Sequence, residues 1–256
     1  MVKGLERFRE HFKEFADRYV LIGGTACDLA FSDAGLAFRA TKDLDVVLCM
    51  ETLDADFGRA FWKFVKQGSY ASQQSSTGER KFYRFSKPTN GDFPFMLELF
   101  SRVPDALTIA AGSTLTPIPI DDAVSSLSAI LLDTEYYDWI LAGRRAIDGI
   151  PIVSAEHLLP LKAKAWLDLR RRKLAGQTID SRDINKHKND AFRLYSIITP
   201  TFRATASGAI ATDMRAFVRA MTSEPVDLKS LGLAKSTKEA VLAALDAMYS
   251  VGGESG

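Results

Sequence analysis

Residues 19 to 26 read Tyr19-Val20-Leu21-Ile22-Gly23-Gly24-Thr25-Ala26, and this segment is the strongest indication of the fold. Its first four residues form a short apolar run that favours a strand, and the run stops at two glycines. A helix is predicted to follow, over Ala26 to Phe31. A strand-to-helix turn with so little side chain lets backbone N–H groups approach a phosphate. The same pattern also occurs as a simple tight turn, so its meaning depends on what surrounds it.

The surrounding motif is Asp43-Leu44-Asp45-Val46-Val47-Leu48, which follows a polar interval. It alternates and then becomes continuously apolar, as in a strand inside a sheet. The two-residue period of a strand sends both carboxylates out of one face, about 7 Å apart along the strand. Carboxylates placed in this way can share divalent cations, which is the chemistry of polymerase-like phosphoryl transfer. A second Asp-x-Asp, Asp54 and Asp56, is interpreted as a helix start.

The first 150 residues are predicted to form a mixed sheet with helices. The other elements predicted there are an amphipathic helix from Leu5 to about Asp17, a helix from Asp54 to Lys66, a hairpin of Lys81–Ser86 and Phe93–Phe100, and strands at Leu115–Ile120 and Ile150–Val153. Beyond Ser154 the predicted elements are helices through Arg172 and over Asp183–Ile198, Thr212–Met221 and Ser236–Tyr249. We therefore expect an α/β (α+β) domain over 1–150 and an all-helical domain over 151–256.

Composition excludes several classes of protein. Hydrophobic residues make up 46% of the 256 and charged residues 25%, which are values typical of a globular chain. Thirty-three basic side chains face 32 acidic ones, so any nucleic-acid contact must come from a local patch. Cys27 and Cys49 are predicted to be buried free thiols. No stretch approaches the roughly 18 apolar residues that a membrane span needs, and we expect a cytoplasmic protein with no membrane partner.

The two motifs together resemble the signature of a known superfamily. The matching stretches are Leu21-Ile22-Gly23-Gly24-Thr25-Ala26 and Thr41-Lys42-Asp43-Leu44-Asp45-Val46-Val47. They resemble the polymerase-β-type nucleotidyltransferases. Within that superfamily the chain is similar to the AbiEii-like toxin family, which includes the mycobacterial MenT toxins. The resemblance covers about residues 19 to 195 and implies a nucleotidyltransferase core domain over 1–150, with a mixed sheet flanked by helices.

The resemblance also implies roles for individual residues. Gly23, Gly24 and Thr25 would lie at the triphosphate, and Asp43 and Asp45 would be catalytic carboxylates that hold Mg²⁺ or Mn²⁺.

Three further residues belong to this predicted site. Arg39 and Lys42 flank the aspartates and either meet the triphosphate or screen the acidic pair. The superfamily often has a third metal-binding carboxylate on a neighbouring strand, for which Glu98 is the candidate. Glu98 shares a strand face with Met96 and Phe100, and a carboxylate in apolar company must be charge-compensated. The alternative is an edge strand with Glu98 facing water.

In the helical half, AbiEii-like proteins have a lysine on the helix after the core and an aspartate on the next helix, both implied in catalysis. Lys162 fits the lysine best, Lys164 is the close alternative that would contact the nucleotide, and Asp190 matches the aspartate. Asp190 would orient the lysine or help to deprotonate the acceptor hydroxyl. His187 is a candidate base, although a histidine beside two lysines is more typical of a solvated helix face.

The leading functional hypothesis is an enzyme that transfers a nucleoside monophosphate from an NTP to a hydroxyl. It would be the toxin of an AbiEii-type toxin–antitoxin pair, with a cognate antitoxin as partner and tRNA as a candidate acceptor. Phosphate contacts to such an acceptor would come from Arg170–Lys173, Lys186 and Lys188. The alternatives are an enzyme that modifies a protein or a small molecule such as an antibiotic, a non-catalytic nucleotide-binding module, and an unrelated α/β domain.

Overall fold

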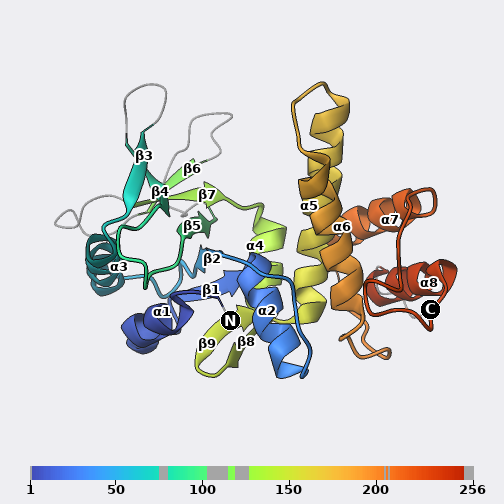
Figure 1. The fold of residues 1–256 in the computed structure, drawn as a ribbon, viewed down its shortest axis with the longest axis horizontal. Coiled ribbons are helices and arrows are strands. Elements are labelled where there is room, and N and C mark those ends of the chain that lie inside the picture. The colour runs from blue at the N-terminus through green and yellow to red at the C-terminus, as the bar shows by residue number, and fades with distance from the viewer. Residues whose placement is uncertain are drawn as a thin grey trace. The chain divides into compact units, whose positions relative to one another are not determined.

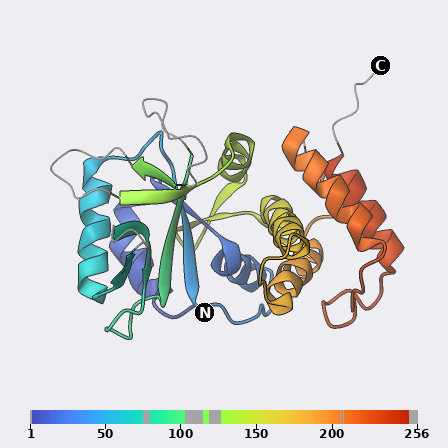
Figure 2. The ribbon, with the colours of Figure 1, turned by 90° about the horizontal axis from the view of Figure 1, so that it is seen from above.

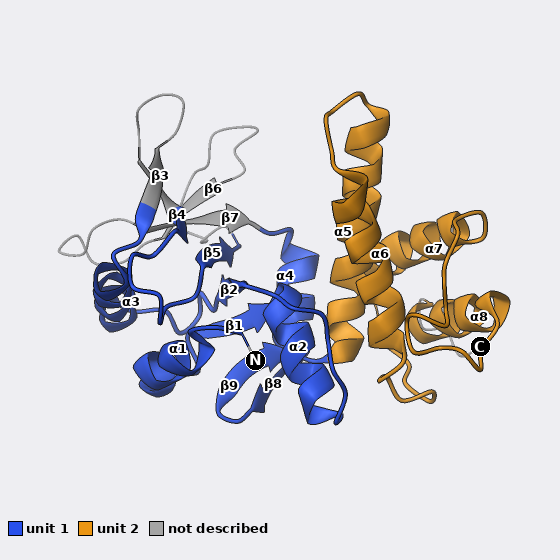
Figure 3. Cartoon of the chain, viewed as in Figure 1, with its two compact units in different colours: residues 1–154 blue, residues 155–256 orange. Residues whose placement is uncertain are grey.

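The computed structural model divides into two compact units, residues 1–154 and 155–256 (Figure 1, Figure 3). It describes residues 2–74, 80–102, 115–118, 127–204, 206 and 208–250. The first unit holds every strand of the described residues, and the second is helical. The mixed α/β fold predicted from the sequence, with a helical second half, is confirmed. The assignment of the two units as a nucleotidyltransferase core domain and a helical C-terminal domain stays a prediction.

The first unit is built on a mixed sheet whose path runs β3-β4-β5-β2-β1-β9-β8, and β7 pairs with both β5 and β6. The strands are β1 (Tyr19–Ile22), β2 (Asp43–Leu48), β3 (Ala71–Gln74), β4 (Arg80–Ser86), β5 (Met96–Ser101), β6 (Leu115–Ile118), β7 (Leu127–Leu131), β8 (Arg144–Ile147) and β9 (Ile150–Val153). The central strand β2 runs antiparallel to β1 and parallel to β5. Its apolar residues are buried, as the sequence pattern predicts for an interior strand.

Helices cover both faces of this sheet. They are α1 (Leu5–Phe12), which continues as the 3₁₀ turn η1 (Lys13–Phe15), α2 (Gly23–Asp33), α3 (Ala55–Gly68) and α4 (Thr134–Ala142). Figure 2 shows α1 and α3 on one side of the sheet and α2 and α4 on the other. The amphipathic pattern of α1 is explained by an aromatic cluster, in which Phe12 lies 5.6 Å from Phe57 and 5.4 Å from Phe64, centroid to centroid.

The second unit consists of α5 (Ala155–Leu174), α6 (Ser181–Tyr195), α7 (Gly208–Met221) and α8 (Lys238–Tyr249). Helices α5 and α6 form a helical hairpin whose arms lie side by side (Figure 1). The ring of Trp166 on α5 packs edge-on against Phe217 of α7, with centroids 5.6 Å apart. These contacts bury one face of each helix, which is why four amphipathic segments form one unit.

Several local predictions are confirmed. Asp54 is the N-cap of α3 and accepts a hydrogen bond of 2.9 Å from the backbone N–H of Phe57. Strands β4 and β5 form the predicted hairpin. Cys27 and Cys49 are buried free thiols, and burial raises the pKa of Cys49 to about 11. In the described part of the chain, no helix is both long enough and apolar enough to cross a membrane.

Other predictions were wrong in their boundaries. The glycines are not a separate turn, because α2 already begins at Gly23. Strand β5 begins at Met96 rather than Phe93, since the turn that opens at Pro88 extends through Phe95. Strands β3, β7 and β8 were not predicted. Residues 119 and 120 of the predicted strand Leu115–Ile120 lie outside the described residues.

The cap of α3 gives a test of the local fold. Asp54→Ala is expected to lower the free energy of unfolding by about 1 kcal/mol, because it removes the acceptor for the Phe57 N–H. Asp54→Asn keeps the cap. Asp56→Ala, in the same Asp-x-Asp but without the cap bond, should stay within about 0.5 kcal/mol. Urea denaturation measures all three, and equal effects of Asp54→Ala and Asp56→Ala would contradict the capping role.

The same cap predicts a pH dependence. The Phe57 N–H and then Arg18, whose Nη2 lies 2.8 Å from the carboxylate, lower the pKa of Asp54 in the folded chain. A lowered folded pKa means that the contribution of Asp54 is present above the unfolded pKa of about 3.9 and is lost as pH falls through the folded value. The difference in stability between the wild type and Asp54→Asn should therefore shrink below about pH 4.

Candidate active site

The site begins where β1 passes directly into α2. Gly23 has φ +70°, a backbone conformation that side-chain-bearing residues rarely adopt. A Cβ atom at this position would collide with the carboxylate of Asp45 and lie 2.7 Å from its Cγ. Strand pairing produces this approach, because Ile22 is the partner of Asp45 in the β1–β2 register. The backbone at the start of α2 therefore lies against the Asp45 carboxylate.

The second glycine faces the segment that leads into β2. A Cβ atom on Gly24 would lie 2.5 Å from Oγ1 of Thr41 and 3.7 Å from Nη2 of Arg39. Arg39 also stacks over the ring of Phe38, 5.1 Å from its centroid. Lys42 is exposed beside them. The predicted basic residue Arg39 is therefore placed at the start of α2, next to the glycine pair.

Thr25 has a different place from the one that the resemblance implies. Its side chain is fully buried, and its hydroxyl donates a hydrogen bond of 2.7 Å to the backbone carbonyl of Asp43. The bond joins the first turn of α2 to the first residue of β2. Thr25 thus positions the glycine pair relative to the aspartates, and the structure directs its side chain into the protein.

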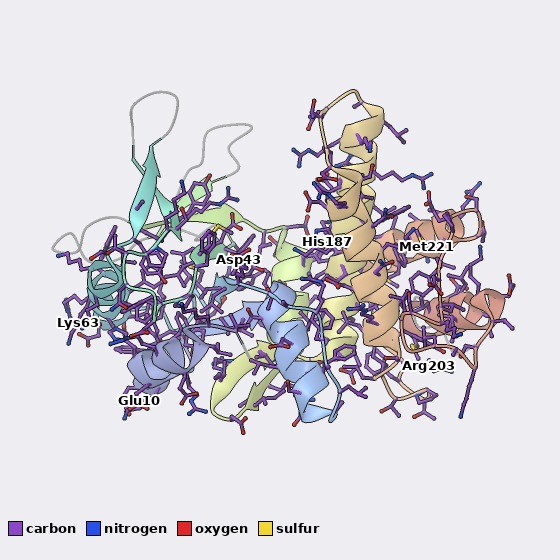
Figure 4. All side chains as sticks on the ribbon, in the orientation of Figure 1. Glu10, Asp43, Lys63, His187, Arg203 and Met221 are labelled. Carbon is purple, nitrogen blue, oxygen red and sulfur yellow. The ribbon has the colours of Figure 1, made fainter. Side chains whose placement is uncertain are left out.

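Asp43 and Asp45 occupy the one end of β2 that is not buried. Both are half-buried, whereas Leu44 and all residues from Val46 to Leu48 are buried. Figure 4 labels Asp43 at this end of the strand. Ile22, the residue before the helix, makes no side-chain capping bond to α2. An anionic pair and a helix N-terminus thus share one edge of the sheet, which is the arrangement that the sequence predicted.

Glu98 lies on the neighbouring strand and is charge-compensated. It is the β5 partner of Asp45 and also the partner of Arg84 on β4. Nε of Arg84 donates a 2.8 Å hydrogen bond to Oε1 of Glu98, and Nη2 of Arg84 contacts the same oxygen. Asp45, Glu98 and Arg84 therefore form a row across β2, β5 and β4. The alternative of a wet edge strand is excluded, because Glu98 is buried and β5 is interior to the sheet.

The predicted three-carboxylate metal site is not assembled in this structure. Among the described residues, no three His, Cys, Asp or Glu side chains are grouped closely enough to hold a metal ion. Glu98 is instead engaged by Arg84. The donor chemistry of Asp43 and Asp45 still fits Mg²⁺ or Mn²⁺, because Mg²⁺ is commonly held by one or two carboxylates together with substrate phosphates.

In the second unit, the structure separates the two candidate lysines. Nζ of Lys162 lies 3.6 Å from Oδ2 of Asp190, and the side chains are 7% and 0% exposed. Nζ of Lys164 instead pairs with Asp213 of α7 at 3.3 Å, and its side chain is 44% exposed. Lys162 is thus the partner of Asp190, as the family pattern predicts. Full burial of Asp190 fits the orienting role and not contact with an acceptor hydroxyl.

Several basic residues of α5 and α6 form ion pairs or hydrogen bonds within the second unit. Arg170 pairs with Glu224 at 3.2 Å, and Arg171 pairs with Asp168 at 2.5 Å. Lys188 is buried, and its Nζ donates a hydrogen bond of 2.8 Å to the carbonyl of Pro225. Burial lowers the pKa of Lys188. The prediction that Lys188 contributes to a phosphate-binding surface was therefore wrong.

Two residues of the site were not identified from the sequence. The predicted hairpin places Arg84 on the strand next to Glu98, and its register, which pairs the two residues, is the signal that could have identified Arg84. The approach of Thr41 to Gly24 depends on the path of the segment before β2, which no local sequence pattern specifies.

Comparisons with known proteins add little to this geometry. No protein-family model matches the sequence, and no curated protein matches it. The chain is similar to the structure of an antigenic nucleotidyltransferase-like protein from Paracoccidioides brasiliensis, with 16% identity, a TM-score of 0.46 and coverage of 97% of this chain and 96% of that one. The chain is also similar to the structure of the Megavirus polyadenylate synthase, with 12% identity and a TM-score of 0.38. That match covers 86% of this chain and 36% of the synthase. At such TM-scores the similarities establish no family.

Gly23 and Gly35 offer a matched test of the close approach, since both have φ +70° but only Gly23 has neighbours where a Cβ would lie. Gly35→Ala should lower the free energy of unfolding by about 1 kcal/mol, because of the left-handed backbone alone. Gly23→Ala should lower it by about 1–3 kcal/mol more, because Asp45 or α2 must move. Urea denaturation of Gly23→Ala, Gly35→Ala and the double variant Gly23→Ala/Asp45→Ala measures the excess.

The double variant is expected to recover most of that excess, because Asp45→Ala removes the colliding atoms. Equal costs for the two glycine substitutions would show that the carboxylate does not lie against Gly23.

The Lys162–Asp190 pair gives a second prediction. Lys162→Met leaves a fully buried carboxylate without its partner and should destabilise the chain by about 3–5 kcal/mol. Lys164→Met, in a partly exposed pair, should cost at most about 1 kcal/mol. Adding Asp190→Leu to Lys162→Met should restore most of the loss. Denaturation curves in which the two lysine variants coincide would refute the pairing.

Proposed function

We propose that this chain is a metal-dependent nucleotidyltransferase that transfers a nucleoside monophosphate from an NTP to a hydroxyl group. The observation that carries the proposal is the approach of Gly23 to Asp45. It places a helix N-terminus without a side-chain cap, which suits phosphate, against Asp45 of the carboxylate pair, which suits a divalent cation. A plain tight turn would not require the glycine backbone to lie against an acidic side chain.

In the proposed reaction the acceptor hydroxyl oxygen forms a bond to the α-phosphorus, and the bond from that phosphorus to the bridging oxygen breaks. Pyrophosphate leaves with the electron pair, and the hydroxyl proton passes to solvent. Mg²⁺ or Mn²⁺ held by Asp43 and Asp45 would supply Lewis-acid stabilisation of the developing charge.

The chain's own groups would bind and orient the nucleotide. Gly23 and Gly24 carry backbone N–H groups that no Cβ atom covers, and Gly23 is partly exposed. Arg39, held beside Gly24, and the exposed Lys42 would neutralise phosphate charge. Thr25 fixes the first turn of α2 on β2 through its bond to the Asp43 carbonyl, so the phosphate-binding and metal-binding groups keep one geometry. Preorganisation of this kind lowers the cost of reaching the transition state.

Participation of Lys162 and Asp190 is a proposal that comes from the family resemblance. Asp190 would orient Lys162, the lysine that the resemblance implies in catalysis. The 3.6 Å pairing of the two buried groups supports the orienting role of Asp190.

The biological role is proposed on the same resemblance. The chain would be the toxin of an AbiEii-type toxin–antitoxin pair with a cognate antitoxin, and tRNA would be its acceptor. Arg171, Arg172, Lys173 and Lys186 are exposed, and phosphate contacts by the first three would compete with their contacts to Asp168, Gln177 and Ser181. A protein or small-molecule hydroxyl is the alternative acceptor.

The test is to incubate the purified protein with each α-labelled NTP, Mg²⁺ or Mn²⁺, and total cellular RNA or protein. Wild type should label one of the two acceptor pools. Asp43→Asn and Asp45→Asn should each lower the labelling by about a hundredfold or more, because each removes a charge on which the cation depends. Asp56→Asn is the matched control, since it makes the same change in the second Asp-x-Asp, at the start of α3.

Label in RNA supports the tRNA proposal, and label in protein supports the alternative acceptor. Nucleotide binding without transfer to either pool would point to a non-catalytic nucleotide-binding module. Unchanged labelling in both site variants would overturn the site.

A further inference from the structure

The helical unit carries a basic groove that none of the proposed chemistry uses. The groove has a volume of about 990 Å³ and is lined by residues of α5, α7 and α8 together with Ser223. Met221, which Figure 4 labels, is the last residue of α7, the helix that supplies most of the lining. Its charged lining consists of Arg170, Arg215, Arg219 and Asp246, so positive charge predominates.

Two of the arginines are available to a ligand. Arg215 and Arg219 are four residues apart on α7, which places them on successive turns of the same helix face. Both are exposed, and neither forms an ion pair among the residues that the structure describes. A solvated helix face usually balances such a pair with acidic residues at helical spacing, and α7 supplies only Thr212 to Arg215, at 3.4 Å.

The third arginine is held in place at the side of the groove. The guanidinium of Arg170 lies 5.0 Å from the ring centroid of Trp166, and its Nη2 lies 3.2 Å from Glu224. Cation–π stacking and the ion pair fix the orientation of the guanidinium. An arginine that is ordered before binding loses less conformational freedom when a ligand arrives.

The floor of the groove is apolar and made of small side chains. The apolar lining residues are Ala216, Val218, Ala220, Leu242 and Ala243. Small residues let a second helix approach the backbones of α7 and α8 closely. None of the lining residues is aromatic. Single-stranded nucleic acid binds through stacking on aromatic rings as well as through charge, so the lining favours a protein ligand over an RNA.

We propose that this groove binds an acidic amphipathic helix of a partner protein. Carboxylates four residues apart on that helix match the spacing of Arg215 and Arg219, and its apolar face covers the alanine, valine and leucine floor. Complementary charge gives the contact its specificity. The proposal is independent of the nucleotidyl transfer assigned to the first unit.

The experiment uses the full chain and a fluorescein-labelled helical peptide with glutamates four residues apart beside an alanine and leucine face. A matched peptide carries lysines in place of the glutamates, and a labelled single-stranded RNA is the third probe. The protein variants are Arg215→Gln/Arg219→Gln and the control Arg182→Gln/Lys229→Gln. The control makes the same change in net charge at exposed positions outside the groove.

Fluorescence anisotropy should show that the wild type and the control bind the acidic peptide, more weakly at high salt. The groove variant should bind the acidic peptide more weakly, by a factor of up to roughly ten, because two exposed charge pairs are lost. Circular dichroism of each variant confirms that it is folded.

Three outcomes would overturn the proposal. The first is that the wild type does not bind the acidic peptide, or that the groove variant and the control bind it equally well. The second is RNA binding that the groove variant loses while the acidic peptide does not bind, which would make the groove a nucleic-acid site. The third is a dimer in sedimentation velocity that only the groove variant loses, because the groove would then serve self-association.

Discussion

The structure depends on the missing side chain at Gly23. Because β1 and β2 pair with Ile22 opposite Asp45, the chain must leave β1 directly over the Asp45 carboxylate, and only a glycine with positive φ fits there. The start of α2, with its partial positive charge, then lies against the Asp45 side chain. The Thr25 hydroxyl holds this turn on β2. Strand pairing therefore builds the site, rather than a flexible loop.

Acidic side chains inside the two units are paired differently from those at the exposed end of β2. Glu98 and Asp190 are buried, and each is neutralised by a basic side chain from the neighbouring element, Arg84 and Lys162 respectively. A buried charge without such a partner would be costly. Asp43 and Asp45 are instead left half-buried at the one end of β2 that is not sealed. Asp43 and Asp45 thus keep access to water, where a cation can meet them.

Sequence reasoning succeeded where the signal was local. Strands β1 and β2 and the Asp54 cap were predicted because a few adjacent residues specify each of them. It failed where tertiary register decides. The pairing of Arg84 with Glu98 depends on hairpin register, and the burial of Lys188 depends on the segment around Pro225. Which lysine pairs with Asp190 also depends on tertiary packing, since either Lys162 or Lys164 could have faced α6; the catalytic role of Lys162 stays a prediction.

If Asp45, lying against Gly23, joins cation binding to triphosphate binding, then nucleotide affinity must depend on both the metal and this carboxylate. Isothermal titration with an α,β-methylene NTP measures that dependence, because this analogue cannot be turned over at the α-phosphorus. We expect the wild type to bind the analogue only with Mn²⁺ or Mg²⁺, and Asp45→Asn to bind it at least about tenfold more weakly, a loss of about 1.4 kcal/mol. Binding of equal strength without metal, or unchanged by Asp45→Asn, would show that Asp45 does not link the two.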